Sequence, residues 1–170
     1  MYWSEKIDLI KKSYSVADFK DPFKNGVEII EKIIVRLFES TWLNFSKSEN
    51  KITLLKQGVY IKNCTVTQLY NEELPHLDVD KNFWLLLMKL PMGSDFRVYD
   101  CNYKPLCELL HLSSGQDKQE FCIVDKKYSW LLFFRIDRTK DKVEIYKTGD
   151  ANIYPALAQV SRPVPRRYLS

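Results

Sequence analysis

The chain has 170 residues, of which 45% are hydrophobic and 14% aromatic. This length and composition suit one domain with a substantial core, and they argue against disorder along the whole chain. The net charge of +4, from 26 basic and 22 acidic residues, is a mild excess that argues against a groove for nucleic acid.

The first residues carry charges of both signs and lead into no apolar segment, so we expect no signal peptide. The longest apolar runs, such as 84–88 and 130–134, are far shorter than the roughly 20 residues that a membrane-spanning helix needs. The sequence therefore predicts a protein with no membrane span that stays in the cytoplasm.

The N-terminal part of the chain has helical periodicity. A short helix is expected over 4–14, and a longer one is expected to begin at Asp21-Pro22, where Asp can cap the helix and Pro suits its first turn. Apolar residues at helical spacing from Val27 onward predict that this second helix runs to about Asn44 and buries one face.

The remainder of the chain reads mainly as strands. Short strands are expected over 51–55, 58–62, 83–90, 95–101, 120–124, 128–135 and 143–146. Asp125-Lys126-Lys127 is expected to form the turn of a hairpin between the strands at 120–124 and 128–135. Thr65 and Gln68 have the spacing of a capping box, which predicts a short helix over 66–73 that ends at Pro75. A further helix is expected to start after Asn102 and to extend to about residue 112.

This order of elements predicts an α+β fold, with N-terminal helices packed on a mainly antiparallel sheet and one helix inserted among the strands. Residues 83–88 and 130–134 are apolar at successive positions, which is typical of central strands covered on both faces. We expect one domain over 1–150. Residues 151–170 contain three prolines and three arginines and no acid, and they are expected to form a strap or tail.

The cysteines and histidines do not form a recognisable metal site. The four cysteines are scattered among apolar neighbours, and the two histidines stand apart, so we expect reduced thiols, no metal and no cofactor. Cys107 and His111 are four residues apart on an expected helix and would share a face. An activated thiol would also need an orienting group and an oxyanion donor, so we assign no catalytic residue.

Other arrangements typical of enzymes are equally weak. Asp78 and Asp80 would lie on one side of a strand, and Glu72 and Glu73 are neighbours, but such pairs also occur on ordinary surfaces. The five glycines are isolated, so the sequence has no glycine-rich phosphate-binding loop.

The clearest charge feature is an acidic segment, which we define as residues 63–80. It contains no Lys or Arg within a basic protein, and acidic clusters of this kind can steer and orient a basic partner. An ordinary solvated helix end and loop is the alternative interpretation. The candidate partner-binding residues are Glu72, Glu73, Asp78 and Asp80.

The run EFCIVDKKYSWLL at 120–132 resembles a segment of a small uncharacterised bacterial domain family, and the resemblance covers about residues 82–150. Some proteins of this type are similar to the immunity proteins of polymorphic toxin and contact-dependent growth inhibition systems. The related pattern continues into paired histidines, whereas this chain has apolar and charged residues at 133–137. A site built on those histidines is therefore not expected here.

The resemblance implies a non-catalytic immunity protein that neutralises a cognate toxin, such as a nuclease, by direct protein–protein contact. The residues leave two alternatives open. One is a small hydrolase or nucleic-acid-processing enzyme that uses Cys107, His111 or the carboxylates, and the other is a structural or phage-type subunit whose apolar surface is covered in an oligomer. The oligomeric state does not follow from the sequence.

Overall fold

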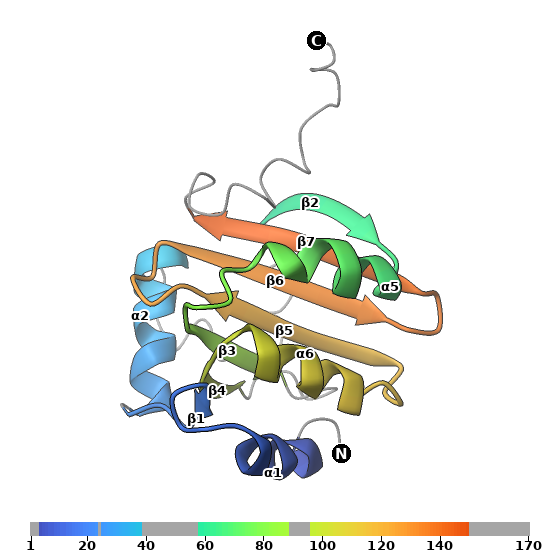
Figure 1. Cartoon of the computed structure of the whole chain (residues 1–170). Coiled ribbons are helices and arrows are strands. Elements are labelled where there is room, and N and C mark those ends of the chain that lie inside the picture. The colour runs from blue at the N-terminus through green and yellow to red at the C-terminus, as the bar shows by residue number, and fades with distance from the viewer. Residues whose placement is uncertain (1–3, 24, 39–57, 89–95, 150–170) are drawn as a thin grey trace.

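The computed structural model describes residues 4–23, 25–38, 58–88 and 96–149, and its centre is a seven-stranded sheet (Figure 1). All neighbouring strands are antiparallel, and their order is β1-β4-β3-β5-β6-β7-β2. The strands are β1 (Phe19–Lys20), β2 (Val59–Cys64), β3 (Phe83–Met88), β4 (Phe96–Cys101), β5 (Lys118–Val124), β6 (Trp130–Asp137) and β7 (Lys142–Gly149).

Helices lie on both faces of this sheet. One face packs against α2, and the other is covered by the remaining helical elements (Figure 1). The helical elements are α1 (Ser4–Ser13), α2 (Gly26–Phe38), α5 (Val66–Gln68), the π-helical turn η1 (Leu69–Glu73), the 3-10 turn η2 (Leu74–His76) and α6 (Tyr103–Leu112).

The central strands are apolar at successive positions because each strand supplies two cores. Phe121 and Ile123 of β5 belong to the core beneath α1 and α6, whereas Cys122 and Val124 pack toward α2. The side chains of a strand alternate between faces, so a sheet covered on both sides needs apolar residues at consecutive positions. The expected α+β fold and the two-sided burial of the central strands are confirmed.

The second helix begins later than predicted. Its N-terminus is at Gly26, where the side-chain oxygen of Asn25 accepts a hydrogen bond of 2.9 Å from the backbone N–H of Val27. Asp21, the predicted cap, instead forms an ion pair of 2.8 Å with Lys11 of α1. The prediction for this helix start was therefore wrong, because Asn25 supplies an equally good cap and Asp21 is used in a contact distant in sequence.

Two further helix boundaries follow the predictions only in part. The capping box at Thr65 and Gln68 is present, with both of its reciprocal hydrogen bonds. Pro75 does not end the helical segment, because it occupies the first turn of η2, where a missing N–H costs nothing. Asn102 is at the N-cap of α6, but its amide donates to Asp18 at 2.8 Å and does not cap the helix.

Several predictions concern residues outside the described ranges. They include the end of the second helix beyond Phe38, the strand over 51–55, the end of the third strand beyond Met88 and the C-terminal segment 151–170. No helix in the described part of the chain is both long enough and apolar enough to cross a bilayer.

Candidate functional site

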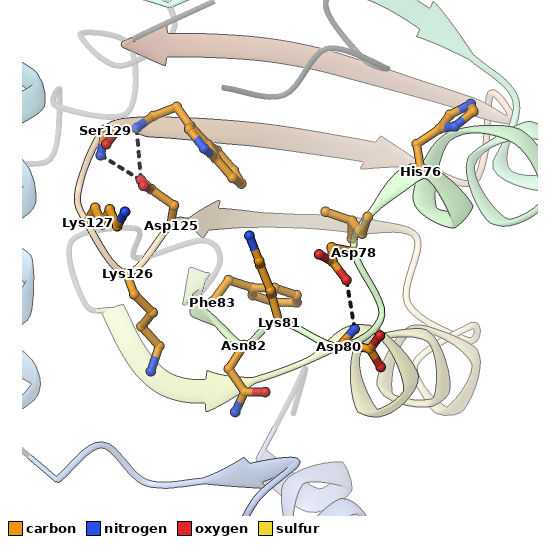
Figure 2. A pocket seen from close by; sticks show the side chains of 12 residues that line it. His76, Asp78, Asp80, Lys81, Asn82, Phe83, Asp125, Lys126, Lys127 and Ser129 are labelled. Carbon is orange, nitrogen blue, oxygen red and sulfur yellow. Dashed lines mark hydrogen bonds between the residues drawn. The ribbon is translucent and has the colours of Figure 1, made fainter. Parts of the chain in front are cut away.

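A pocket of about 780 Å³ lies at one end of the sheet, at the start of β3 and β6 (Figure 2). One wall is the connection from η2 to β3, and the other is the turn between β5 and β6. Phe83 and Trp130, which are 4% and 7% exposed, belong to the adjoining core and supply its apolar base. The volume is in the range of pockets that hold a small molecule or a few side chains.

The wall formed by the η2–β3 connection carries carboxylates. The side chain of Asp78 accepts a hydrogen bond of 3.0 Å from the backbone N–H of Asp80, which fixes a local turn. Both residues are exposed and line the pocket, and Figure 2 shows them on the same wall. Lys81 follows them and also lines the pocket, so this wall is not uniformly acidic.

The opposite wall is the turn over 125–129, which contains the predicted turn residues 125–127 and is two residues longer than predicted, because β6 begins at Trp130. One oxygen of Asp125 accepts hydrogen bonds from the backbone N–H groups of Ser129 and Trp130, at 2.6 and 3.0 Å. Tyr128 completes the turn with a φ of 58°, a left-handed conformation that non-glycine residues rarely adopt. Asp125 therefore has a structural task in the turn, although it lines the pocket.

Gly149, the last residue of β7, lies directly across the sheet from Trp130. It has a φ of 96°, and a Cβ atom at this position would collide with the carbonyl oxygen of Ser129 and the backbone of Trp130. A glycine is needed here because the end of β7 passes very close to this wall of the pocket.

The buried carboxylate of Asp100 connects the two walls. It accepts hydrogen bonds from Asn82 on one wall, at 2.7 Å, and from Lys126 on the other, at 2.8 Å. The ammonium group of Lys126 also lies over the Trp84 ring, 3.9 Å from its centroid. Figure 2 shows that the Lys126 side chain points away from the centre of the pocket. Asp100 is 8% exposed, whereas Lys126 is an exposed residue, so these contacts are only partly shielded from water.

Some of the charged residues that line the pocket already have contacts within the protein, and the others remain available to contact a ligand. Lys126 is paired with Asp100, and Asp125 holds the turn. Among the described residues, Lys81 and Lys127 form no ion pair, and both line the pocket beside Asp78 and Asp80. Beside the half-buried Asp125, the pocket therefore presents two exposed carboxylates and two exposed ammonium groups around an apolar base.

The predicted partner-binding residues divide between two environments. Glu72 is exposed on η1, and Asp78 and Asp80 line the pocket. Glu73 is only 2% exposed and forms an ion pair of 2.9 Å with Lys62. The carboxylate of Glu73 is therefore not presented at the surface, and the candidate contact set reduces to the other three acids.

Sequence reasoning did not identify the rest of the pocket. Lys127 was interpreted as a turn residue, and Lys81 lies one residue outside the acidic segment. The sequence did not indicate that Asp100 belongs to the site, because an acidic residue at the end of a strand is common. The hairpin prediction around Asp125 is the one signal that placed part of a wall correctly.

Cys107 and His111 lie on α6 and do not line this pocket. Burial raises the pKa of the Cys107 thiol above its ordinary value, which disfavours the reactive thiolate at neutral pH. The His111 ring stacks on Tyr70, with 4.2 Å between the ring centroids. Both side chains therefore have packing partners in the layer of helices.

The four cysteines form no disulfide, and three of them are buried. Within the described ranges, no group of three or more His, Cys, Asp or Glu side chains is arranged to hold a metal ion. A comparison of the chain with protein-family models, curated proteins and solved structures found no match.

Proposed function

We propose that this chain is a non-catalytic binding protein, and specifically a cytoplasmic immunity protein that neutralises a cognate bacterial toxin by direct contact. The observation that carries the proposal is the pocket between the η2–β3 connection and the β5–β6 turn. It combines an apolar aromatic base with exposed charged groups around it, an arrangement that resembles the apolar centre and polar rim of a protein–protein interface.

The rigidity of the pocket supports a binding role. Its two walls are tied together through Asp100, and its turn is fixed by Asp125. A preorganised surface loses little conformational entropy when a partner docks, so more of the contact energy appears as affinity. The toxin-neutralising role itself is taken from the resemblance of residues 120–132 to immunity-type proteins.

The direct test is co-expression with the C-terminal domain of a secreted toxin encoded beside this chain. We expect the chain to restore growth of cells that produce the toxin domain, and the two purified proteins to form a complex in isothermal titration calorimetry. The variant Asp78→Asn/Asp80→Asn should bind at least about tenfold more weakly, because it removes two charges from the contact surface.

A matched control is Glu31→Gln, which removes an exposed carboxylate from α2 on the opposite face of the sheet. It should leave both growth rescue and affinity unchanged. If the chain neither rescues growth nor binds the neighbouring toxin domain, the immunity role is wrong. Equal losses in the pocket variant and the control would show that the pocket is not the contact site.

A further inference from the structure

The available charges of the pocket point to a partner of mixed charge, in contrast to the basic partner that the acidic segment alone suggested. Asp78 and Asp80 are on the wall formed by the η2–β3 connection, and Lys127 is on the wall formed by the turn. A ligand with only positive charges would satisfy the carboxylates but would be repelled by Lys81 and Lys127. A ligand with only negative charges would be attracted by the two lysines but repelled by Asp78 and Asp80.

The base of the pocket adds an apolar requirement. Phe83 and Trp130 are largely buried and expose only a small part of their side chains at the base, between the two charged walls. An apolar side chain that enters the pocket would cover these rings and exclude water from the neighbouring charge contacts. Exclusion of water strengthens such contacts, since ion pairs at fully exposed positions contribute little.

The spacing of the walls is held by contacts within the described chain. Asp100 joins Asn82 to Lys126, and it therefore fixes the η2–β3 connection relative to the β5–β6 turn. The pairing also removes Lys126 from the charges available to a ligand. Two walls held at a fixed spacing, each with its own arrangement of charged groups, can discriminate between ligands by the order and sign of their charges.

We propose that the pocket binds an extended segment of the protein partner in which an apolar side chain is flanked by one basic and one acidic side chain. The basic side chain faces Asp78 and Asp80, the apolar side chain packs on Phe83 and Trp130, and the acidic side chain faces Lys127 on the opposite wall. This assignment rests on the proposed function as a protein-binding module and names the chemistry of the segment that is bound.

The test uses three blocked pentapeptides, with the sequences Gly-Lys-Trp-Glu-Gly, Gly-Lys-Trp-Lys-Gly and Gly-Glu-Trp-Glu-Gly. Binding to the full chain is followed by NMR chemical-shift titration of the backbone amides. We expect the mixed-charge peptide to bind at least tenfold more tightly than either like-charged peptide, with the largest shifts at 77–83 and 125–130. Its affinity should fall at high salt.

Variants of the two walls test separately which wall contacts the basic and which the acidic side chain of the peptide. Asp78→Asn/Asp80→Asn should weaken binding of the mixed peptide and leave the Glu-Trp-Glu peptide unaffected or better bound. Lys127→Met should weaken binding of the mixed peptide and leave the Lys-Trp-Lys peptide unaffected or better bound. Lys140→Met, an exposed change in the turn at the other end of β6, is the matched control and should change none of the affinities.

Three results would overturn the assignment: no shifts at millimolar peptide, a preference for the Lys-Trp-Lys peptide, or equal affinity for all three peptides. Binding of free tryptophan as tight as that of the mixed peptide would also overturn it, because it would indicate a small-molecule site. Failure here is distinguishable from failure of the immunity role. If the toxin domain still binds and Asp78→Asn/Asp80→Asn weakens it, only the segment chemistry is wrong.

Discussion

The acidic segment contains two kinds of carboxylate that look alike in sequence and differ completely in the folded protein. Glu73, on η1, is buried and paired with Lys62 of β2. Asp78 and Asp80, only a few residues further along, are exposed in the wall of a pocket. The comparison shows that one acidic stretch of sequence can supply both a structural ion pair and a recognition surface. Which role a carboxylate takes depends on whether it lies in the layer of helices or in the connection that follows them.

The largest effect is expected from removing the partner of the buried acid. Lys62→Met leaves the Glu73 carboxylate inside the protein without its counter-charge, and its other oxygen has no hydrogen-bond partner in the described part of the chain. We expect the free energy of unfolding to fall by about 2–3 kcal/mol, measured by urea denaturation. The double variant Lys62→Met/Glu73→Gln should recover part of this loss. A loss below about 0.5 kcal/mol, typical of surface positions, would contradict the structural role of this pair.

The next effect concerns the link between the two walls of the pocket. Asp100→Ala removes the acceptor of both Asn82 and Lys126, and we expect a loss of about 2 kcal/mol in the free energy of unfolding. The amide shifts of residues on both walls should move together in NMR spectra. Asp100→Asn keeps a side-chain oxygen for Asn82 and should lose less. Shifts confined to β4 would show that Asp100 does not couple the two walls.

Adjacent lysines of the turn provide a matched pair. Lys126 has an ion pair with Asp100 and an aromatic ring beneath its ammonium group, whereas Lys127 has no ion pair within the described residues. Lys126→Met should lower the free energy of unfolding by about 1 kcal/mol, and Lys127→Met by less than about 0.3 kcal/mol. Thermal denaturation of the two variants side by side measures the difference. Equal effects would contradict the separation of structural and available charges in the pocket.

The burial of Cys64, which also belongs to the acidic segment, predicts that the stability of the protein depends on pH. Burial, and secondly the charge of Glu73, raise the pKa of the Cys64 thiol from 9.0 to about 11. The folded protein therefore holds this proton more tightly than the unfolded chain does, so the Cys64 contribution to stability is full below pH 9 and is lost as the pH rises toward 11.

The variant Glu73→Gln separates the two causes of this shift. It should move the pKa of the Cys64 thiol part of the way back toward its ordinary value, because burial, the larger cause, remains. The chemical shift of the Cys64 Cβ carbon, followed against pH, reports the change. A pKa unaffected by the variant would show that Glu73 does not act on this thiol.

A small effect on stability is also expected for the exposed acids of the segment. Asp78→Asn/Asp80→Asn should change the free energy of unfolding by no more than about 0.5 kcal/mol, while it weakens partner binding. Denaturation and calorimetry on the same preparation measure both quantities. A stability loss as large as that of Lys62→Met would show that Asp78 and Asp80, like Glu73, stabilise the fold.

Local patterns were good guides to the elements of this fold and poor guides to its site. The capping box at Thr65, the turn at Asp125 and the two-sided strands were all predictable, because each depends on residues close together in sequence. The start of α2 was not predictable in this way, because Asp21 and Asn25 are both competent caps. The ion pair between Asp21 and Lys11 decides between them. Helix ends are sensitive to such competition because the alternatives differ by only about 1 kcal/mol.

The sequence by itself determined that the chain forms an α+β domain with an antiparallel sheet, since hydrophobic periodicity and turn residues act over short distances. It also identified Asp78 and Asp80 as candidate contact residues. Only the tertiary structure decided that Glu73 is buried against Lys62 and that Lys127 of the β5–β6 turn lines the same pocket as Asp78 and Asp80, on its opposite wall. Charge sign is a property of each residue, but the field in a pocket depends on which distant residues the sheet brings together, and strand order and register decide that.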